Sequence, residues 1–416
     1  MSEKGLPSLS LEKLRKELYD CSRCGFCSVW EWKGVVWVCP TYPYTEAYDT
    51  QYARGRLRMA QSFFEKDADI NLAYLEHAMQ CSLCGSCGVH CPVDIPLFEI
   101  WHAWRKDLVQ AGYVLPAHQR AADNVAQHYN IFGPSLRPPG RPARPGGAAS
   151  QIPSRSPGSG RAGGKLAEPA QEKRKVDVLY FPGCQTSRKA RGIGQATASL
   201  LSKLNLDYAV LQEDACCGYP LYDIGQMAVA RQTALHTIEK IKSYQPDVVL
   251  TTCIGCYRAL TAVYPNHLGL DFGVQVQHVH DFFPKLIQGR FALQSISRKI
   301  TFHDPCIMGR HMGLYDEPRS LVSSIPGVDL VEMYSHREHG LCCGAGGGVL
   351  GAFDEIAAQV AIERLQQAAA AGAEQLVTSC PTCVVNLKRA IKKAGVDISV
   401  SDIVELIDEA MPNDRD

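Results

Sequence analysis

The sequence has no long hydrophobic run, no excess of charge of either sign and no apolar leader. Its apolar runs, such as Val35–Val38, are far shorter than the roughly 20 residues that span a bilayer, so we expect no membrane span and membrane association only through a partner. The 43 basic and 43 acidic residues argue against nucleic-acid binding, which usually requires a basic face. The first residues, MSEKGLPSLSLEKLRKEL, contain no apolar segment and no cleavage site, which predicts a cytoplasmic protein without a secretory signal.

Cysteine, by contrast, is abundant, at 18 of the 416 residues. Reducing compartments disfavour structural disulfides, so spaced cysteines there are usually metal ligands or redox groups. Buried structural thiols would be scattered irregularly, but these cysteines fall into two ferredoxin-type runs and two larger sets of five. The spacing therefore predicts an iron–sulfur electron-transfer protein.

The pattern of apolar residues first separates an N-terminal part from a linker. Residues 1–132 contain short amphipathic stretches around cysteine loops, for example at 52–65 and 97–111, which predicts a small all-α ferredoxin-like domain. Residues 133–175 are rich in Pro, Gly, Ser and Arg. Such a segment buries too little apolar surface to offset its ordering entropy, which predicts a flexible linker. We favour a solvated tether over the alternative that its basic residues dock on an acidic partner.

The rest of the chain contains two copies of one unit, 176–296 and 297–416. DVLYFPGC matches KITFHDPC, ACCGYP matches LCCGAG, and VVLTTCIGC matches QLVTSCPTC. Short apolar runs alternate with helical runs in both copies, which predicts α/β domains with parallel strands. A repeat of about 120 residues is too long for a solenoid and indicates a duplicated domain.

The N-terminal cysteines form two ferredoxin runs. Residues 81–92 have the complete pattern Cys-x2-Cys-x2-Cys-x3-Cys-Pro, and a second run begins at residue 21 and ends at Cys39-Pro40 after a widened loop. In such proteins the fourth cysteine of each run reaches the cluster of the other run. We therefore expect two cubane [4Fe–4S] clusters with crossed ligands: Cys21, Cys24, Cys27 and Cys91 for one, Cys81, Cys84, Cys87 and Cys39 for the other. Zinc sites use CxxC pairs rather than such triplets.

The widened loop, residues 28–38, carries three tryptophans about a Lys33-Gly34 turn. This arrangement predicts a small hairpin that lies over a cluster. We favour a lid that excludes water and tunes the redox potential over an aromatic docking surface for a redox partner.

Each copy of the C-terminal unit contains a single cysteine, a Cys-Cys-Gly triplet and a CxxC pair. The ten cysteines are Cys184, Cys216, Cys217, Cys253, Cys256, Cys306, Cys342, Cys343, Cys380 and Cys383. The single cysteine and the CxxC pair follow predicted strands, at the edge where open α/β sheets hold ligands. Helix N-termini there lower thiolate pKa values and favour an anionic cluster.

Two further features near these cysteines have simpler explanations beside functional ones. Gly346, Gly348 and Gly351 spell a dinucleotide-binding fingerprint, but the adjacent Cys-Cys pair commits the loop to metal and no strand leads directly into it. Three histidines, His303, His336 and His339, lie near cysteines in the sequence. Each could relay protons or could be an ordinary hydrogen-bonded residue.

These motifs resemble those of heterodisulfide reductase. The five-cysteine unit resembles the CCG domain of its B subunit, the N-terminal half resembles its C subunit, and the fused order resembles its D subunit. The segment Ala53-Arg54-Gly55-Arg56-Leu57 also resembles the RGR segment of the glycolate oxidase iron–sulfur subunit and lactate-utilisation proteins. In the heterodisulfide reductase family, each complete CCG domain holds a noncubane [4Fe–4S] cluster, and the two clusters face each other across a pocket where a disulfide is split.

The resemblance implies an oxidoreductase subunit with two cubane and two noncubane clusters, the latter giving the ten C-terminal cysteines a catalytic role. It implies that electrons pass from a flavin-containing partner through the cubanes to the noncubane pair, which acts on a disulfide or thiol substrate or passes electrons onward. One alternative is an electron-wire subunit of a flavin-linked 2-hydroxyacid dehydrogenase or a low-potential acyl-CoA reductase complex. The other is a colourless zinc-stabilised scaffold without a redox role.

Overall fold

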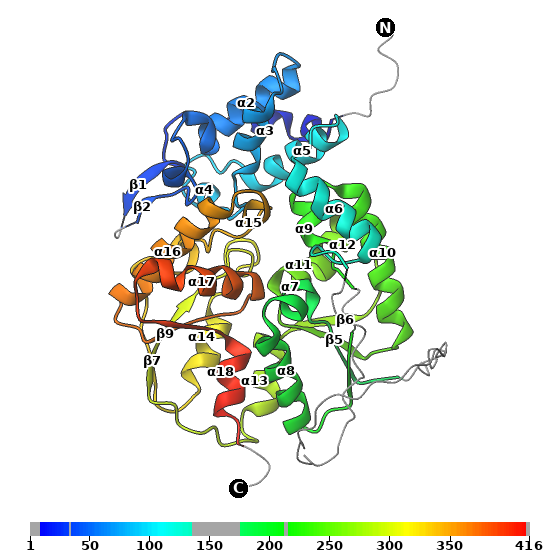
Figure 1. The fold of residues 1–416 in the computed structure, drawn as a ribbon, viewed down its shortest axis with the longest axis vertical. Helices are drawn as coiled ribbons and strands as arrows, with labels where there is room; N and C mark the ends of the chain where they lie inside the picture. The colour runs from blue at the N-terminus through cyan, green and yellow to red at the C-terminus, as the bar shows by residue number, and fades with distance from the viewer. Residues whose placement is uncertain (1–8, 33–34, 135–174, 212–214, 413–416) are drawn as a thin grey trace, which may run out of the picture.

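The computed structural model describes residues 9–32, 35–134, 175–211 and 215–412. The predicted linker lies almost entirely outside the described residues, and so does the Lys33-Gly34 turn. In Figure 1 the N-terminal region (blue to cyan) lies above the two C-terminal repeats, one green and the other yellow to red.

The N-terminal region consists mainly of short helices. Its elements are η1 (Ser10–Leu14), α1 (Arg15–Tyr19), β1 (Val29–Trp32), β2 (Val35–Trp37), α2 (Ala53–Glu65), α3 (Leu72–Met79), α4 (Ser86–Val89), α5 (Leu97–Gln110) and α6 (Pro116–His128). In α2 the buried residues Ala53, Arg56, Leu57 and Ala60 recur with the helical period, so one face packs inward. Strands β1 and β2 pair antiparallel. The hairpin expected at the tryptophan loop is therefore present, and the region is not all-α.

Each C-terminal repeat contains one four-stranded parallel sheet, as expected. The first comprises β3 (Val178–Tyr180), α7 (Gly183–Arg188), α8 (Arg191–Lys203), β4 (Tyr208–Val210), α9 (Tyr219–Asp223), α10 (Met227–Ser243), β5 (Val248–Thr251), α11 (Ile254–Arg258), α12 (Tyr264–His267), β6 (Gln275–His278) and α13 (Val279–Ile287). The second comprises β7 (Arg298–His303), α14 (Asp316–Ser323), β8 (Val328–Leu330), α15 (Val349–Ala352), α16 (Asp354–Ala370), β9 (Gln375–Thr378), α17 (Pro381–Ala394), β10 (Ser399–Asp402) and α18 (Ile403–Ala410).

The two sheets have the same strand order. The first is β4-β3-β5-β6 and the second is β8-β7-β9-β10, with every neighbouring pair parallel. The chain reverses its direction of winding between the two central strands of each sheet. Open α/β sheets bind ligands at such a switch point, outside the carboxyl ends of the strands.

The two repeats share one hydrophobic core. Helix α8 of the first repeat packs against α18 of the second, and Leu200 and Ile403 are both fully buried in the shared core. The Lys203 ammonium donates to the Asp408 carboxylate at 2.9 Å across the same contact. Helix α18 begins at a capping box, in which Asp402 accepts from the backbone and Glu405 accepts from the backbone N–H of Asp402, which stabilises the helix that joins the repeats.

The N-terminal region docks on both repeats. Helix α6 contacts α10 of the first repeat and α15 of the second, and α5 contacts α9. Figure 1 shows α6 beside α10. This docking brings the second ferredoxin run next to the cysteines of the second repeat.

Candidate iron–sulfur sites

The two ferredoxin triplets have the same backbone conformation. The residue before the second cysteine is left-handed in both runs, with φ of 61° at Arg23 and 55° at Leu83, and so is the glycine after it, with φ of 84° at Gly25 and 78° at Gly85. Glycine adopts such angles without a steric penalty. Two tight left-handed turns in each run curl the three cysteines around a common point.

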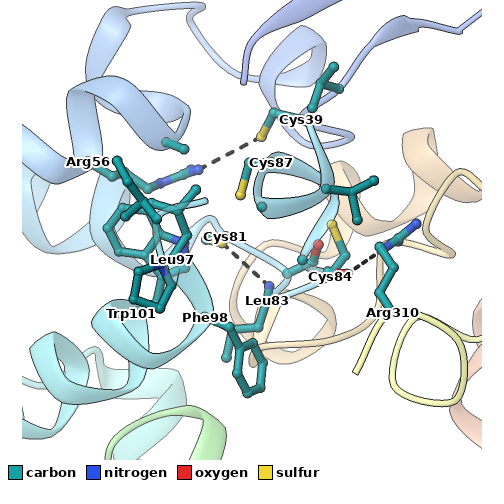
Figure 2. Close-up of a pocket in the computed structure, with 18 of the residues that line it drawn as sticks. Cys39, Arg56, Cys81, Leu83, Cys84, Cys87, Leu97, Phe98, Trp101 and Arg310 are labelled. Carbon is teal, nitrogen blue, oxygen red and sulfur yellow. Dashed lines mark hydrogen bonds between the residues drawn. The ribbon is translucent and has the colours of Figure 1, made fainter. Parts of the chain in front are cut away.

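One cavity collects the second triplet together with Cys39. This cavity, of about 270 Å³, is lined by Cys39, Cys81, Cys84 and Cys87 but not by Cys91, and Figure 2 shows the four thiols converging on it. Burial raises the pKa of the Cys81 and Cys87 thiols above the ordinary value. Four converging thiols from two distant segments have the donor chemistry of a cubane site.

Two arginines, the buried Arg56 and the half-buried Arg310, lie on the wall of the same cavity. The Arg56 Nη1 lies 3.9 Å from the Cys39 Sγ, and the Arg310 Nε donates to the Cys84 carbonyl at 2.6 Å. In each guanidinium the Nη2 atom is buried without a hydrogen-bond partner among the described residues. Cationic donors at the wall of this cavity fit an anionic cluster with sulfide acceptors.

The first triplet lies nearer the surface. Cys24 is exposed, whereas Cys21, Cys27 and Cys91 are half-buried and pack against the same N-terminal core. Burial, with smaller effects from Cys21 and Cys39, raises the pKa of the Cys27 thiol to about 11. The two ferredoxin sites are therefore neighbours. The first has the exposed Cys24, and the second, called the enclosed site below, has the buried thiols Cys39 and Cys84.

The first repeat brings its five cysteines together at the switch point of its sheet. Cys184 lies in α7 just after β3, and Cys253 is the N-cap residue of α11, just after β5. Hydrogen bonds between thiols connect all five buried side chains in the order Cys184, Cys216, Cys217, Cys256 and Cys253.

The second repeat reproduces this chain of thiols. Hydrogen bonds connect its cysteines in the equivalent order Cys306, Cys342, Cys343, Cys383 and Cys380. The glycine of each Cys-Cys-Gly triplet donates its N–H to the sulfur two residues earlier, at 3.4 Å in the first repeat and 3.3 Å in the second. Each set offers five thiols, one more than a tetrahedral zinc site uses.

The second repeat also contacts the enclosed ferredoxin site. The Cys84 thiol hydrogen-bonds the Cys342 thiol, and this contact raises the pKa of Cys84 well above its ordinary value. Sequence spacing does not predict this contact, because it depends on how the N-terminal region docks. The contact places Cys84, a candidate ligand of a cubane cluster, against Cys342, a candidate ligand of the cluster in the second repeat.

The glycine-rich loop of the second repeat packs against the backbone of the second ferredoxin run. A Cβ at Gly346 would lie 2.5 Å from the Ser82 carbonyl oxygen, and one at Gly347 would lie 2.4 Å from the Cys81 carbonyl oxygen. Only glycine allows the two backbones to approach so closely. Gly346 thus serves a contact between domains, whereas a Cβ at Gly351 would meet nothing within 4 Å, so the contact accounts for one glycine of the fingerprint.

Tyr219 lies between the two sets of C-terminal cysteines. A Cβ on Gly255, in the first CxxC pair, would lie 3.5 Å from its ring. Burial, and then nearby groups that include Asp223 and Cys306, raise the pKa of Tyr219 well above its ordinary value. The first cysteine of the second repeat therefore lies close to the site of the first repeat.

All eighteen cysteines are free thiols in the structure. Iron–sulfur clusters are held by thiolates, so this donor set fits [4Fe–4S] groups at the sites described.

Comparison with known proteins agrees with this arrangement. Residues 178–261 and 300–388 match the cysteine-rich CCG domain, and residues 17–95 match a 4Fe-4S dicluster domain. The D subunit of the dihydromethanophenazine:CoB–CoM heterodisulfide reductase of Methanosarcina mazei is 31% identical, over 98% of this chain and 98% of that protein. The chain belongs to the family of heterodisulfide reductase D subunits.

This member of the heterodisulfide reductase family also resembles proteins of other oxidoreductases. The B subunit of the fumarate reductase (CoM/CoB) of Methanothermobacter marburgensis is 29% identical over 57% of this chain and 47% of that protein. The EtfAB:quinone oxidoreductase of Syntrophomonas wolfei is 27% identical over 81% of this chain and 47% of that protein. The chain is therefore an iron–sulfur electron-transfer subunit of an oxidoreductase.

A membrane-spanning helix must be both long and apolar. Within the described ranges, no helix combines the length and the apolar character that crossing a bilayer requires.

Proposed function

We propose that this subunit relays electrons from a flavin-containing partner to its two C-terminal sites, where a disulfide is reduced to two thiols. The observation that carries the proposal is the completeness of both five-cysteine sets, each connected thiol to thiol and buried except at the half-buried Cys306. Membership of the heterodisulfide reductase family supports the substrate class.

We infer the cluster types from the donor sets together with the family resemblance. Cys81, Cys84, Cys87 and Cys39 would hold one cubane [4Fe–4S] cluster, because these four thiols line one cavity. The first triplet and Cys91 would hold the other cubane, as the crossed pattern of ferredoxin runs requires. Each five-cysteine set would hold a noncubane [4Fe–4S] cluster. Bound clusters supply one-electron transfer and, at the C-terminal pair, iron sites that accept sulfur.

The protein residues provide a continuous path between these sites. Cys27 lies near Cys39, which connects the exposed site to the enclosed one. The contact between the Cys84 and Cys342 thiols then connects the enclosed site to the second repeat. Tyr219 lies where the two C-terminal sets approach each other. The order of burial therefore matches a route from the surface at Cys24 to the interior.

The reaction balances with two electrons and two protons. The sulfur–sulfur bond of the substrate breaks, each sulfur gains one electron, and each resulting thiolate takes one proton to give two thiols. The electrons come from the reduced flavin of the partner. The partner would dock at the first triplet, since Cys24 is the exposed member of the ferredoxin runs.

The test supplies the anaerobically prepared full chain with a strong artificial reductant and low-molecular-weight disulfides. We expect thiol release that is lost on Cys216→Ser or Cys342→Ser and kept on Thr261→Ala, an exposed position of the first repeat. Iron content and visible absorbance should be measured on every variant.

Two results would contradict the proposal in different ways. Zinc in place of iron at the C-terminal sites would refute the cluster assignment for those sites. Clusters that are reduced and reoxidised normally, without turnover of any disulfide, would instead favour an electron wire within a larger oxidoreductase.

A further inference from the structure

The two C-terminal sites differ in one buried residue. In the matching segments FPGC and HDPC, Phe181 of the first repeat corresponds to His303 of the second. Both side chains are fully buried. The first repeat therefore places a hydrocarbon ring where the second places an imidazole.

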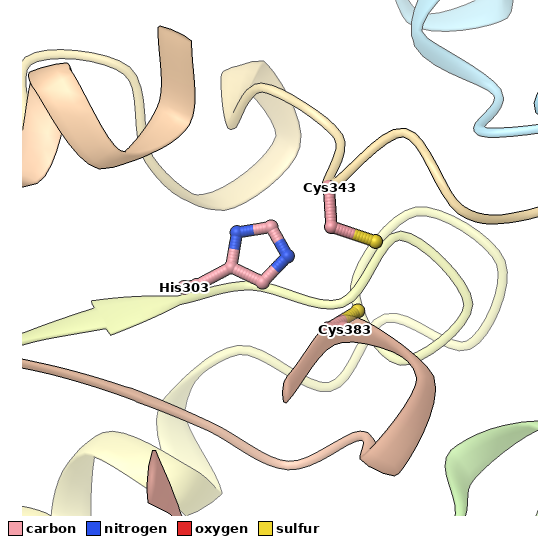
Figure 3. Close-up of side chains that lie close together, drawn as sticks. All are labelled: His303, Cys343 and Cys383. Atoms are coloured by element: carbon pink, nitrogen blue, oxygen red, sulfur yellow. The ribbon is translucent and has the colours of Figure 1, made fainter. Parts of the chain in front are cut away.

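The imidazole of His303 faces two sulfurs of its site. One ring nitrogen and the Sγ atoms of Cys343 and Cys383 all lie within 4.8 Å of one another, and Figure 3 shows the outer ring nitrogen, Nε2, directed at both sulfurs. This Nε2 atom has no hydrogen-bond partner among the described residues. A buried polar nitrogen without a partner is costly, so its environment is expected to include an acceptor.

The other ring nitrogen fixes which tautomer is present. The Nε of Arg364 donates to the His303 Nδ1 at 3.1 Å. A guanidinium has donors but no acceptor, so Nδ1 carries a lone pair and the proton of the neutral ring is on Nε2. The guanidinium is itself held by the Ser335 carbonyl at 2.8 Å and the Gln367 Oε1 at 2.7 Å, which fixes its orientation.

This tautomer decides between two roles for His303. An Nε2 that carries a proton has no lone pair for a metal, so the group of His303, Cys343 and Cys383 is not a three-ligand ion site. It is an N–H donor facing two sulfurs. Hydrogen bonds to the sulfurs of a cluster withdraw negative charge and stabilise the reduced state, which raises the reduction potential.

We propose that His303 donates its Nε2–H to the sulfur ligands in the second repeat and makes that site a better electron acceptor than the first. This inference rests on the proposed function, because it requires a cluster in each repeat. Phe181 offers no such donor to the first repeat. The second repeat, which already contacts the enclosed ferredoxin site through Cys84 and Cys342, then also has the higher potential of the pair.

The first experiment needs no variant. The full chain is labelled with ¹⁵N-histidine, loaded with iron anaerobically and reduced, and the paramagnetic clusters are examined by pulsed electron paramagnetic resonance. We expect a ¹⁵N coupling to one C-terminal cluster, transmitted through the N–H···S contact, and its loss on His303→Gln, which carries no labelled nitrogen. A spectrum without ¹⁵N coupling in the unaltered chain would overturn the inference.

The second experiment measures midpoint potentials by redox titration. His303→Phe copies the first repeat and should lower the potential of one C-terminal cluster, with the iron content unchanged. His303→Gln should restore most of the difference, since its amide can accept from Arg364 and donate to sulfur. His336→Phe is the matched control, because the His336 ring contacts the Met333 carbonyl at 2.8 Å rather than a cysteine.

The outcomes separate the inference from the proposed function. If the unaltered chain holds no cluster in the second repeat, the proposed function fails before any variant is compared. If the clusters are present and His303→Phe keeps its iron and its potential, the inference is wrong while the proposed function stands. If His303→Phe loses iron, the potential of His303→Gln and the ¹⁵N coupling decide the question.

Discussion

Arg105 connects three separate parts of the chain, and its removal should destabilise the whole assembly. This side chain of α5 is fully buried. It donates to the carbonyls of Cys81 at 2.7 Å, Asp223 at 3.0 Å and Gly347 at 2.8 Å, which belong to the ferredoxin run, the first repeat and the second repeat. Two longer bonds reach carbonyls at the end of α3. We therefore expect Arg105→Met to loosen the contact among all three parts.

The magnitude follows from the carbonyls left behind. Each buried acceptor that loses its partner costs about 1–3 kcal/mol, so the three short bonds suggest roughly 3–9 kcal/mol. Methionine occupies most of the vacated space and removes a buried charge, which relieves part of this cost. We expect a loss of about 4 kcal/mol in the free energy of unfolding. With an m-value of about 2–3 kcal/mol per molar urea, the midpoint should fall by roughly 1.5 M.

The assay is anaerobic urea unfolding of the iron-loaded full chain, followed by far-ultraviolet circular dichroism and by cluster absorbance. Arg105→Lys should give an intermediate loss, because one ammonium group cannot reach carbonyls on three segments. Arg120→Met, at an exposed position of α6, is the matched control and should change stability by less than about 0.5 kcal/mol. If Arg105→Met unfolds at the same urea concentration as the control, the bonding of Arg105 does not hold these parts together.

Three further predictions concern the clusters and the backbone around them. Anaerobically prepared protein should contain about sixteen irons, from four [4Fe–4S] groups; elemental analysis that finds zinc in either half would refute that half. Cys39→Ala should remove the enclosed cubane and Cys91→Ala the exposed one, which spectroscopy of the single variants can separate. If Cys91→Ala disturbs the enclosed cubane alone, the crossed ligation is wrong. Gly55→Ala should lower the free energy of unfolding by roughly 2–3 kcal/mol, because its Cβ would lie 1.9 Å from the Asp49 carbonyl oxygen. Gly88→Ala, whose Cβ would meet nothing within 4 Å, is the control, and equal stabilities would contradict this steric argument.

The spacing of cysteines in the sequence indicates which cysteines lie together where one motif or one sheet edge positions them. The ferredoxin run predicts that Cys39 and the second triplet are ligands of one cluster; these four cysteines line one cavity, and their ligation stays a prediction. The carboxyl ends of parallel strands meet at one edge, so the expectation that Cys184 and Cys253 lie together is matched by their connected thiols. The central strand β9, Gln375–Thr378, is buried along its whole length, as is typical of parallel strands covered on both faces.

Features that depend on docking were not predictable in this way. The amphipathic pattern of α5 indicates that one face is buried, but it does not say that Arg105 meets Gly347. Arg310 belongs to a loop without periodicity, and nothing in its sequence context indicates a bond to the Cys84 carbonyl. The edge strands β6 and β10 have the sequences QVQH and SVSD, which are too polar to stand out from loops.

The contact between the glycine-rich loop and the carbonyls of Cys81 and Ser82 has a consequence for biosynthesis. The N-terminal region leaves the ribosome first, and the wall that Arg310 contributes to the enclosed cavity is made only when the second repeat is synthesised. Until then this site is open on one side to the proteins that deliver iron and sulfide. Docking of the second repeat covers this side of the site, so we expect a cluster to enter more readily before that repeat docks than after it.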